Sequence, residues 1–259
     1  MRDIYYVNVG CANVYSEPSY RSEIETQTLL WESVKVEAEQ EDFLRIYTED
    51  EYAGWISRSQ IVPSTSTSNQ YKIVTQSLSA IYSEPSVKSE LIREVTALGR
   101  LLVDEVKSGW VRVILPDGEE GWIQEHAFTP LPQLTRQNLI DFARGFLGVS
   151  YLWGGKTPKG FDCSGLVQFL FAMFKIPLKR NASMQFEKGK FVSENPEDGQ
   201  MGDLMFFEEN GKITHVGICL GNSRLLHARG FVRVNSLSTH HPDFSERLKN
   251  EFVAIRTYF

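Results

Sequence analysis

An ungapped repeat fills the first half of the chain. The segment VYSEPS at residues 14–19 recurs as IYSEPS at residues 81–86, an offset of 67. Two further pairs share this offset: FLRI at 43–46 with WVRV at 110–113, and Gly-Trp-Ile at 54–56 with 121–123. One offset across three separated blocks implies a duplicated unit with no net insertion. Each copy consists of short alternating stretches between turn residues, which predicts a small β-barrel.

Polar and proline-rich stretches mark the ends of the two copies. Residues 63–69, PSTSTSN, form a polar linker between them, and Pro130-Leu-Pro132 closes the second copy. From Leu134 onward, apolar residues recur at helical spacing. The sequence therefore predicts three domains, which span residues 1–66, 67–130 and 131–259.

A possible nucleophile lies at the start of an apolar helix in the third domain. A glycine-rich loop ends at Phe161-Asp162, and apolar residues at three- and four-residue steps follow from Cys163. Asp162 stands where an N-cap is expected, since its carboxylate can accept the unpaired N–H groups of the first turn. A thiol at this place meets the positive end of the helix dipole. We therefore expect Cys163 to be a reactive thiolate rather than a small core residue.

Two histidines lie on a predicted β-hairpin further along the chain. Residues 213–220 and 224–228 alternate like strands, with a turn signal at 221–223. A three-residue turn would direct His215 and His227 to the same face of the sheet, and a two-residue turn would direct them to opposite faces. A cysteine, a histidine base and a third polar group that orients the base are the parts of thiol acyl-transfer catalysis.

Several short motifs in the last half of the chain occur in a recognisable order. They are Tyr151-x-Trp153-Gly154-Gly155, Phe161-Asp162-Cys163-Ser164-Gly165-Leu166-Val167, Gly202-Asp203-Leu204-Met205-Phe206-Phe207, His215-Val216-Gly217-Ile218 and His227-Ala228. Together they resemble the NlpC/P60 family of cysteine peptidases. The two copies of the repeat, each with Gly-Trp-Ile near its end, resemble bacterial SH3 (SH3b) domains. The resemblance implies an α+β protein with two small SH3-like β-barrels followed by a papain-like NlpC/P60 domain.

The resemblance also implies the roles of the catalytic residues. Cys163 would be the nucleophile and His215 the general base that later protonates the leaving amine. His227 would orient and polarise His215. The hydroxyl of Tyr151 would hold the oxyanion together with the backbone N–H of Cys163.

The order SH3b–SH3b–NlpC/P60 resembles the peptidases that cleave γ-D-glutamyl–diamino acid bonds in peptidoglycan stem peptides. In that group the first SH3b domain closes over the active site, so that only peptides with a free N-terminal L-alanine fit. A buried carboxylate must then meet the substrate ammonium, because a desolvated charge without a partner is costly. Asp162 is one candidate, and the resemblance adds Glu17 and Tyr52. Glu17 has an alternative role in turn formation, because Glu84 repeats it in the second copy.

Other residues of the matched motifs have assignments of lower specificity. Ser164 either binds the backbone of the substrate or helps to cap the helix. By resemblance, Trp153 and Ser183 contact substrate. Structural roles are expected for three further residues: Arg180, Gln185 and Asp203.

Composition excludes some functions. A net charge of −6 and a pI near 5.5 give no footprint for nucleic acid, and no basic run suggests anionic lipid. The sequence has no apolar run long enough for membrane insertion. Three cysteines without metal-ligand spacing indicate reduced thiols and no metal or other cofactor. The first ten residues contain no apolar signal core, so a cytoplasmic monomer is expected, or a periplasmic or extracellular protein if a signal peptide has been removed.

Two alternatives remain open at this stage. The same triad serves amidases, transpeptidases and acyltransferases. A wall-binding SH3b protein with a vestigial catalytic domain is a non-enzymatic alternative, although an intact set of Cys163, His215 and His227 disfavours it. The sequence leaves open whether diaminopimelate or lysine is preferred and whether the free L-alanine is required.

Overall fold

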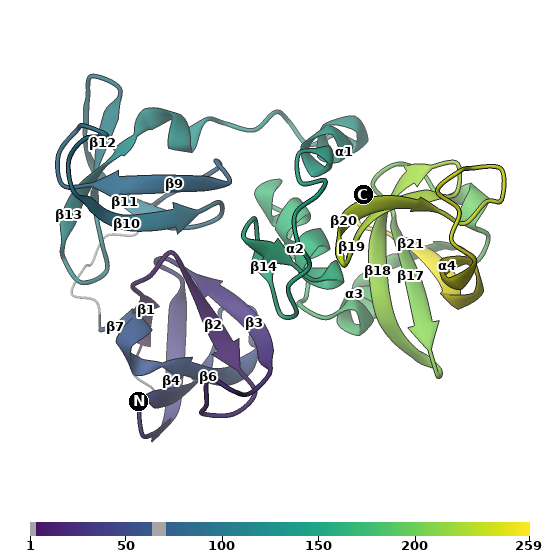
Figure 1. The fold of residues 1–259 in the computed structure, drawn as a ribbon, viewed down its shortest axis with the longest axis horizontal. Coiled ribbons are helices and arrows are strands. Elements are labelled where there is room, and N and C mark those ends of the chain that lie inside the picture. Colours follow the sequence, from purple (N-terminus) through teal and green to yellow (C-terminus); the bar gives the residue numbers. More distant parts are fainter. Residues whose placement is uncertain (1–3, 64–70) are drawn as a thin grey trace. The chain divides into compact units, whose positions relative to one another are not determined.

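The computed structural model describes residues 4–63 and 71–259, and the chain divides into two compact units, Met1–Leu131 and Pro132–Phe259 (Figure 1). Apart from Pro63, the predicted linker at 63–69 lies outside the described residues.

The first copy of the repeat forms a seven-stranded antiparallel sheet in the order β3-β2-β6-β5-β4-β1-β7. Its strands are β1 (Ile4–Val7), β2 (Cys11–Tyr15), β3 (Ile24–Leu29), β4 (Ser33–Gln40), β5 (Phe43–Tyr47), β6 (Ala53–Ser57) and β7 (Ile61–Val62). Alternate residues of these strands, such as Val14, Leu44, Ile46 and Ile56, are buried together in one apolar core. The predicted alternation thus identifies the buried face of the sheet.

The second copy forms a six-stranded sheet in the matching order β10-β9-β13-β12-β11-β8. Its strands are β8 (Tyr71–Ile73), β9 (Leu78–Tyr82), β10 (Leu91–Thr96), β11 (Arg100–Lys107), β12 (Trp110–Ile114) and β13 (Glu120–Gln124). An irregularity between Val36 and Ala38 in β4 recurs between Val103 and Glu105 in β11, at the same offset. The duplication inferred from the sequence is therefore present in the strand order, in the register and in the bulge.

Closed barrels are not confirmed. Over the described residues, the hydrogen-bonded strands of each sheet run between two edge strands and do not close into a ring. Alternation in sequence places residues on one face of a strand, whereas closure depends on pairing between strands far apart in the chain. The two copies also share a core: Trp31 of the first packs among the apolar residues of the second, and its indole N–H donates to Ile114 O at 3.0 Å.

The second unit is built on a six-stranded antiparallel sheet in the order β16-β21-β17-β18-β19-β20. These strands are β16 (Lys190–Ser193), β17 (Leu204–Glu209), β18 (Lys212–Gly221), β19 (Arg224–Arg229), β20 (Phe231–Ser236) and β21 (Phe252–Thr257). A small separate hairpin comprises β14 (Lys156–Thr157) and β15 (Gly160–Phe161).

The helices of this unit are α1 (Arg136–Arg144), α2 (Cys163–Met173), α3 (Ala182–Lys188) and α4 (Glu246–Glu251). Helix α2 is buried on almost all sides and packs against β18 and β19. A cluster of aromatic rings joins α1 to α2, with Phe142 and Phe146 both in contact with Phe169. None of the helices that the structure describes is long and apolar enough to cross a membrane.

Candidate active site

Cys163 is the first residue of α2, and Asp162 caps the helix as predicted. Asp162 has extended backbone angles, and its Oδ1 accepts the N–H of Gly165 at 2.6 Å. The Cys163 side chain is 9% exposed. The capped helix end thus holds a nearly buried thiol in a defined place.

Asp162 also ties three separate segments together. Its Oδ2 accepts the N–H of Gly154 in the glycine-rich loop at 3.0 Å. Arg180 donates to both carboxylate oxygens, at 3.0 Å to Oδ1, and also donates to Ser164 Oγ at 3.0 Å. Because Arg180 is only 2% exposed, this is a buried ion pair whose charges are compensated by hydrogen bonds. We call this ion pair of Asp162 with Arg180, together with its hydrogen bonds, the clamp. It aligns the start of α2 with the glycine-rich loop.

The two histidines meet because of an unexpected combination of turn and bulge. Asn222 and Ser223 both have positive φ (52° and 57°) and form a two-residue turn, the shorter of the two turns considered from the sequence. An irregularity between Cys219 and Gly221 adds one residue to β18, so that Ile218 pairs with Leu226. The two histidines therefore share a face of the sheet with a two-residue turn, because the bulge supplies the extra residue that a longer turn would have supplied.

His215 and His227 are hydrogen-bonded to each other. His215 Nε2 lies 2.8 Å from His227 Nδ1, and the two rings cross at 83°. Gly217 lies two residues after His215 in β18 and opposite His227 in β19. Because it has no side chain, it leaves room for the two rings to meet. A Cβ at Gly217 would lie 2.9 Å from the Cβ of His227.

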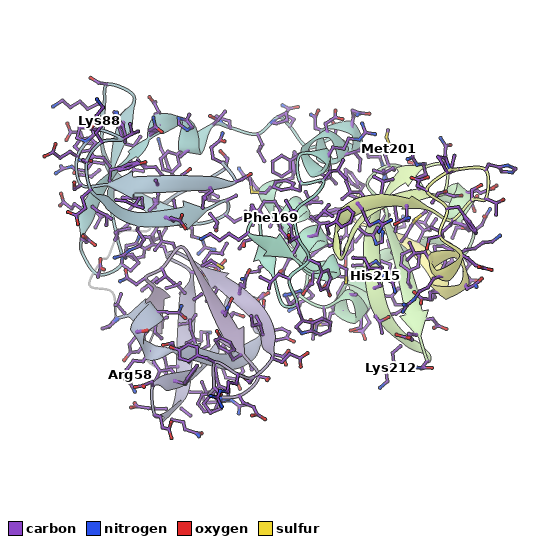
Figure 2. All side chains as sticks on the ribbon, in the orientation of Figure 1. Arg58, Lys88, Phe169, Met201, Lys212 and His215 are labelled. Carbon is purple, nitrogen blue, oxygen red and sulfur yellow. The ribbon has the colours of Figure 1, made fainter. Side chains whose placement is uncertain are left out.

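The Cys163 thiol lies against the strand that carries His215. Its S–H points to the carbonyl of Thr214, with Sγ and O 3.9 Å apart, and the N–H of Val216 donates to the sulfur. Thr214 and Val216 flank His215 in β18, which packs against α2; Figure 2 labels His215 on this strand and Phe169 on the helix. The fold thus brings together the three residues proposed for the triad.

Burial sets the protonation of this group. It raises the pKa of the Cys163 thiol to about 11, with the charge of Asp162 adding to the effect. Burial, assisted by His227, lowers the pKa of His215 well below its ordinary value. Burial likewise lowers the pKa of His227 to about 4. At neutral pH the site therefore contains a thiol and two neutral imidazoles, and the thiolate expected from the helix dipole is not favoured, because desolvation outweighs the dipole.

Comparison with known proteins agrees with this geometry. Residues 148–251 match the NlpC/P60 family. The second unit contains an NlpC/P60 domain. Residues 14–61 match the bacterial dipeptidyl-peptidase SH3 domain, so the first copy of the repeat is a bacterial SH3 domain. The assignment of the second copy to the SH3b domains remains a prediction.

Two curated relatives and one solved structure resemble the chain over most of its length. A γ-D-glutamyl-L-lysine dipeptidyl-peptidase of Bacillus cereus is 27% identical, over 92% of this chain and 76% of that protein. Dipeptidyl-peptidase 6 of Lysinibacillus sphaericus is 28% identical, over 96% of this chain and 97% of that protein. The crystal structure of an NlpC/P60 family protein from Bacillus cereus has a TM-score of 0.87 and 23% identity, with 99% of both chains covered, and shares the fold.

Tyr151 and Trp153 lie on the glycine-rich loop of the NlpC/P60 domain. Tyr151 is half-buried, and burial with the nearby charges of Cys163 and Asp162 raises the pKa of its hydroxyl. The hydroxyl therefore keeps its proton and can act as a hydrogen-bond donor. Trp153 is 59% exposed and is available for contact with a ligand.

The segment that follows α2 is hydrogen-bonded to the start of that helix. Gln185 in α3 is fully buried, and its Nε2 donates to the carbonyl oxygens of Ser164 (3.1 Å) and Lys179 (2.8 Å). Ser183, in the same helix, is exposed. Asp203 is buried and accepts from Arg136 at 2.7 Å and from the N–H of Gln200 at 3.0 Å, which holds the loop before β17 as expected.

Glu17 and Tyr52 belong to the first unit. Glu17 is exposed, and its main chain exchanges hydrogen bonds with the Ser22 hydroxyl. Glu84 and Ser89 repeat this arrangement in the second copy, which favours turn formation as the role of the repeated glutamate. The Tyr52 hydroxyl donates to Glu25 Oε2 at 2.8 Å.

One residue of the site was missed from the sequence. Asn235 in β20 lies with its Oδ1 3.1 Å from His227 Nε2. The alternation of β20 opposite β19 was the available signal, because His227 pairs with Arg233 and residue 235 points to the same face. Among residues 4–63 and 71–259, His, Cys, Asp and Glu side chains form no group of three suited to a metal ion.

Proposed function

We propose that the protein is a cysteine endopeptidase that hydrolyses the γ-D-glutamyl–diamino acid bond of peptidoglycan stem peptides with a free N-terminal L-alanine. The observation that carries the proposal is the 2.8 Å bond between His227 of β19 and His215 of β18, the strand against which the Cys163 thiol packs. The substrate class is supported by two relatives that match more than nine-tenths of this chain, both named as dipeptidyl-peptidases, one of them as a γ-D-glutamyl-L-lysine dipeptidyl-peptidase. Such peptides are released when the wall is recycled or remodelled.

In the first step, Cys163 attacks the carbonyl carbon of the γ-glutamyl amide. A thiol with a pKa of about 11 needs a base, and the neutral imidazole of His215 takes the proton as the sulfur–carbon bond forms. The backbone N–H of Cys163 and the hydroxyl of Tyr151 stabilise the negative charge that develops on the carbonyl oxygen.

In the second step, the carbon–nitrogen bond breaks. His215 returns its proton to the departing amine of the diamino acid, and a thioester remains on Cys163. A water molecule then attacks the thioester, His215 takes a proton from the water, and that proton returns to the sulfur as the dipeptide leaves.

Substrate recognition is assigned to residues around this centre. Trp153 and Ser183 are exposed in the NlpC/P60 domain and would contact the peptide. Ser164 shares Arg180 with Asp162 and would contact the substrate through its remaining hydrogen-bonding capacity. The substrate ammonium would be met by Asp162, and Glu17 and Tyr52 stay the further candidates that the resemblance adds.

The test is product analysis by mass spectrometry with L-Ala-γ-D-Glu-L-Lys and L-Ala-γ-D-Glu-meso-diaminopimelate. Each peptide is offered in two forms, one with a free N-terminal amine on L-alanine and one with that amine acetylated. The proposal expects release of L-Ala-D-Glu from the free peptides only, and the comparison of the two peptides identifies the preferred diamino acid.

Two variants complete this experiment. Cys163→Ala should reduce the rate by at least about 10³-fold, whereas Cys219→Ala, which removes another buried thiol of the same domain, should retain activity. Equal cleavage of free and acetylated peptides would overturn the requirement for a free amine and indicate action on the intact wall. If neither peptide is cleaved by a reaction that requires Cys163, the enzymatic proposal is wrong.

A further inference from the structure

The hydrogen bonds of the histidine pair continue into a third strand. His227 Nε2 lies 3.1 Å from Asn235 Oδ1, and Asn235 Nδ2 lies 2.9 Å from the main-chain oxygen of Asp243. His227 is 1% exposed and Asn235 is 8% exposed, so each bond forms away from bulk water. The series therefore runs without a break from His215 to the loop between β20 and α4.

The direction of every bond in this series follows from its last member. A carbonyl oxygen can only accept, so the amide nitrogen of Asn235 must face Asp243 and the amide oxygen must face His227. The carbonyl is itself held in place, because it also accepts the N–H of Ser236 at 2.9 Å. Since an amide oxygen cannot donate, His227 carries its proton on Nε2.

The same logic determines the state of His215. With its proton on Nε2, neutral His227 presents a bare Nδ1, which accepts the N–H of His215 Nε2. His215 then has its lone pair on Nδ1, which is the nitrogen that remains to take the proton of the Cys163 thiol. The opposite tautomer of His215 would place a proton on that nitrogen and prevent proton transfer.

We propose that Asn235 is a positioning residue that sets the tautomers of both histidines. It acts by transmitting the fixed orientation of the Asp243 carbonyl through His227 to His215. The proposal rests on the proposed function only where it concerns rates, because the tautomers exist without substrate.

The surrounding charges explain why a neutral amide occupies this place. The groups that act electrostatically on the two rings are cationic, and they come from three elements: Arg229 of β19, Arg233 of β20 and Arg247 of α4. The Cys163 thiol of α2 lies against Thr214, the residue before His215. These cations oppose a positive charge on His227, so an amide is sufficient to orient the ring, and His215 alone becomes charged during the reaction.

The loop that carries the carbonyl has its own anchor. Arg224 donates to Asp243 Oδ2 through Nε at 3.2 Å and through Nη2 at 2.7 Å. This ion pair involves the side chain of Asp243 only, whereas Asn235 uses the main chain. His240→Gln is the matched control, because His240 lies in the same loop, is exposed and makes none of the contacts of this series.

The experiment is ¹⁵N NMR of the imidazole nitrogens in the full-length protein, combined with pH profiles of kcat/KM. In the wild type, His227 should show a protonated Nε2 and a bare Nδ1, and His215 should show the same pattern. Asn235→Leu, which keeps the size but removes the acceptor, should mix the tautomers of His227. It should lower kcat by about 10- to 100-fold with little change in KM, as expected when a group that only orients a reacting residue is lost.

Two further variants separate positioning from folding. Asn235→Asp keeps an acceptor at His227, so it should restore the tautomers, while its negative charge should move the acid limb of the kcat/KM profile to higher pH. His240→Gln should leave both tautomers and the pH profile unchanged. A wild-type His227 protonated on Nδ1, or an Asn235→Leu protein with wild-type tautomers, would overturn the proposal. Absence of peptide cleavage combined with the expected NMR pattern would refute the proposed function alone.

Discussion

The buried histidine pair should make the NlpC/P60 domain sensitive to acid, and His227 provides the measurable case. Burial lowers its pKa from an ordinary value of 6.5 to about 4, with Arg229 and Arg233 acting in the same direction and the bond to Asn235 opposing them. Between these two pH values the unfolded chain binds a proton on His227 that the folded chain does not. The free energy of unfolding must therefore fall as the pH falls from about 6.5 to about 4.

The size of the effect follows from the shift in pKa. One unit corresponds to about 1.4 kcal/mol, so His227 alone should remove about 3 kcal/mol of stability over this range. This is a large part of the 5–15 kcal/mol that is typical of a domain. His227→Gln removes the titration and keeps a side chain that can both donate and accept, so its stability should depend less on pH by about that amount.

The assay is hydrogen exchange of the full-length protein as a function of urea, read by mass spectrometry on peptides from 216–228 at pH 7 and pH 4. Reading only these peptides separates the domain from the first unit. His240→Gln is the matched control, because His240 is exposed and loses little water on folding, so this variant should follow the wild type. An equal loss of stability in wild type and His227→Gln would refute the assignment of acid sensitivity to desolvation of His227.

Three further predictions concern the same domain. Alkylation of Cys163, resolved by mass spectrometry, should accelerate about tenfold per pH unit from pH 7 to beyond pH 9, since burial raises the pKa of the thiol to about 11; a plateau at pH 7 would indicate a preformed thiolate. Gly217→Ala should cost about 1–3 kcal/mol in thermal unfolding and displace His227 in imidazole NMR spectra, because the new Cβ would lie 2.9 Å from the Cβ of His227. Arg180→Met should cost about 3–5 kcal/mol in urea unfolding by leaving Asp162 without its buried partner, and Asp162→Asn in the same chain should recover part of the loss; a cost below about 1 kcal/mol would contradict the clamp.

Features that depend on local patterns were predictable. The offset of 67 residues predicted a duplicated unit of short strands, and the two copies do share their strand order and a bulge at the same offset. Asp162 was expected to cap α2, and its carboxylate does so, because a cap needs only residues adjacent in the chain. The shared face of His215 and His227, which the sequence made a requirement for the triad, is present in the pairing of β18 with β19.

Features that depend on turns and distant pairing were less accessible. The turn at Asn222 and Ser223 is the two-residue one, which alone would have put the histidines on opposite faces, and the bulge next to Cys219 compensates for it. Alternation alone does not decide between a three-residue turn and a two-residue turn with a bulge, because both arrangements bury the same face of the hairpin. Closure of the SH3-like sheets was also not confirmed, since it depends on strands at opposite ends of each copy.

The chemistry of the site was determined by tertiary structure. Sequence alone led to the proposal that Cys163, His215 and His227 are the reacting group, because their types and order resemble the family motifs. Packing of α2 against the sheet removes water from the thiol and from both rings, which reverses the expected ionisation of Cys163. Asn235 became part of the site only when β20 paired with β19. Desolvation and the direction of hydrogen bonds depend on what lies nearby in space, and only the folded chain determines that.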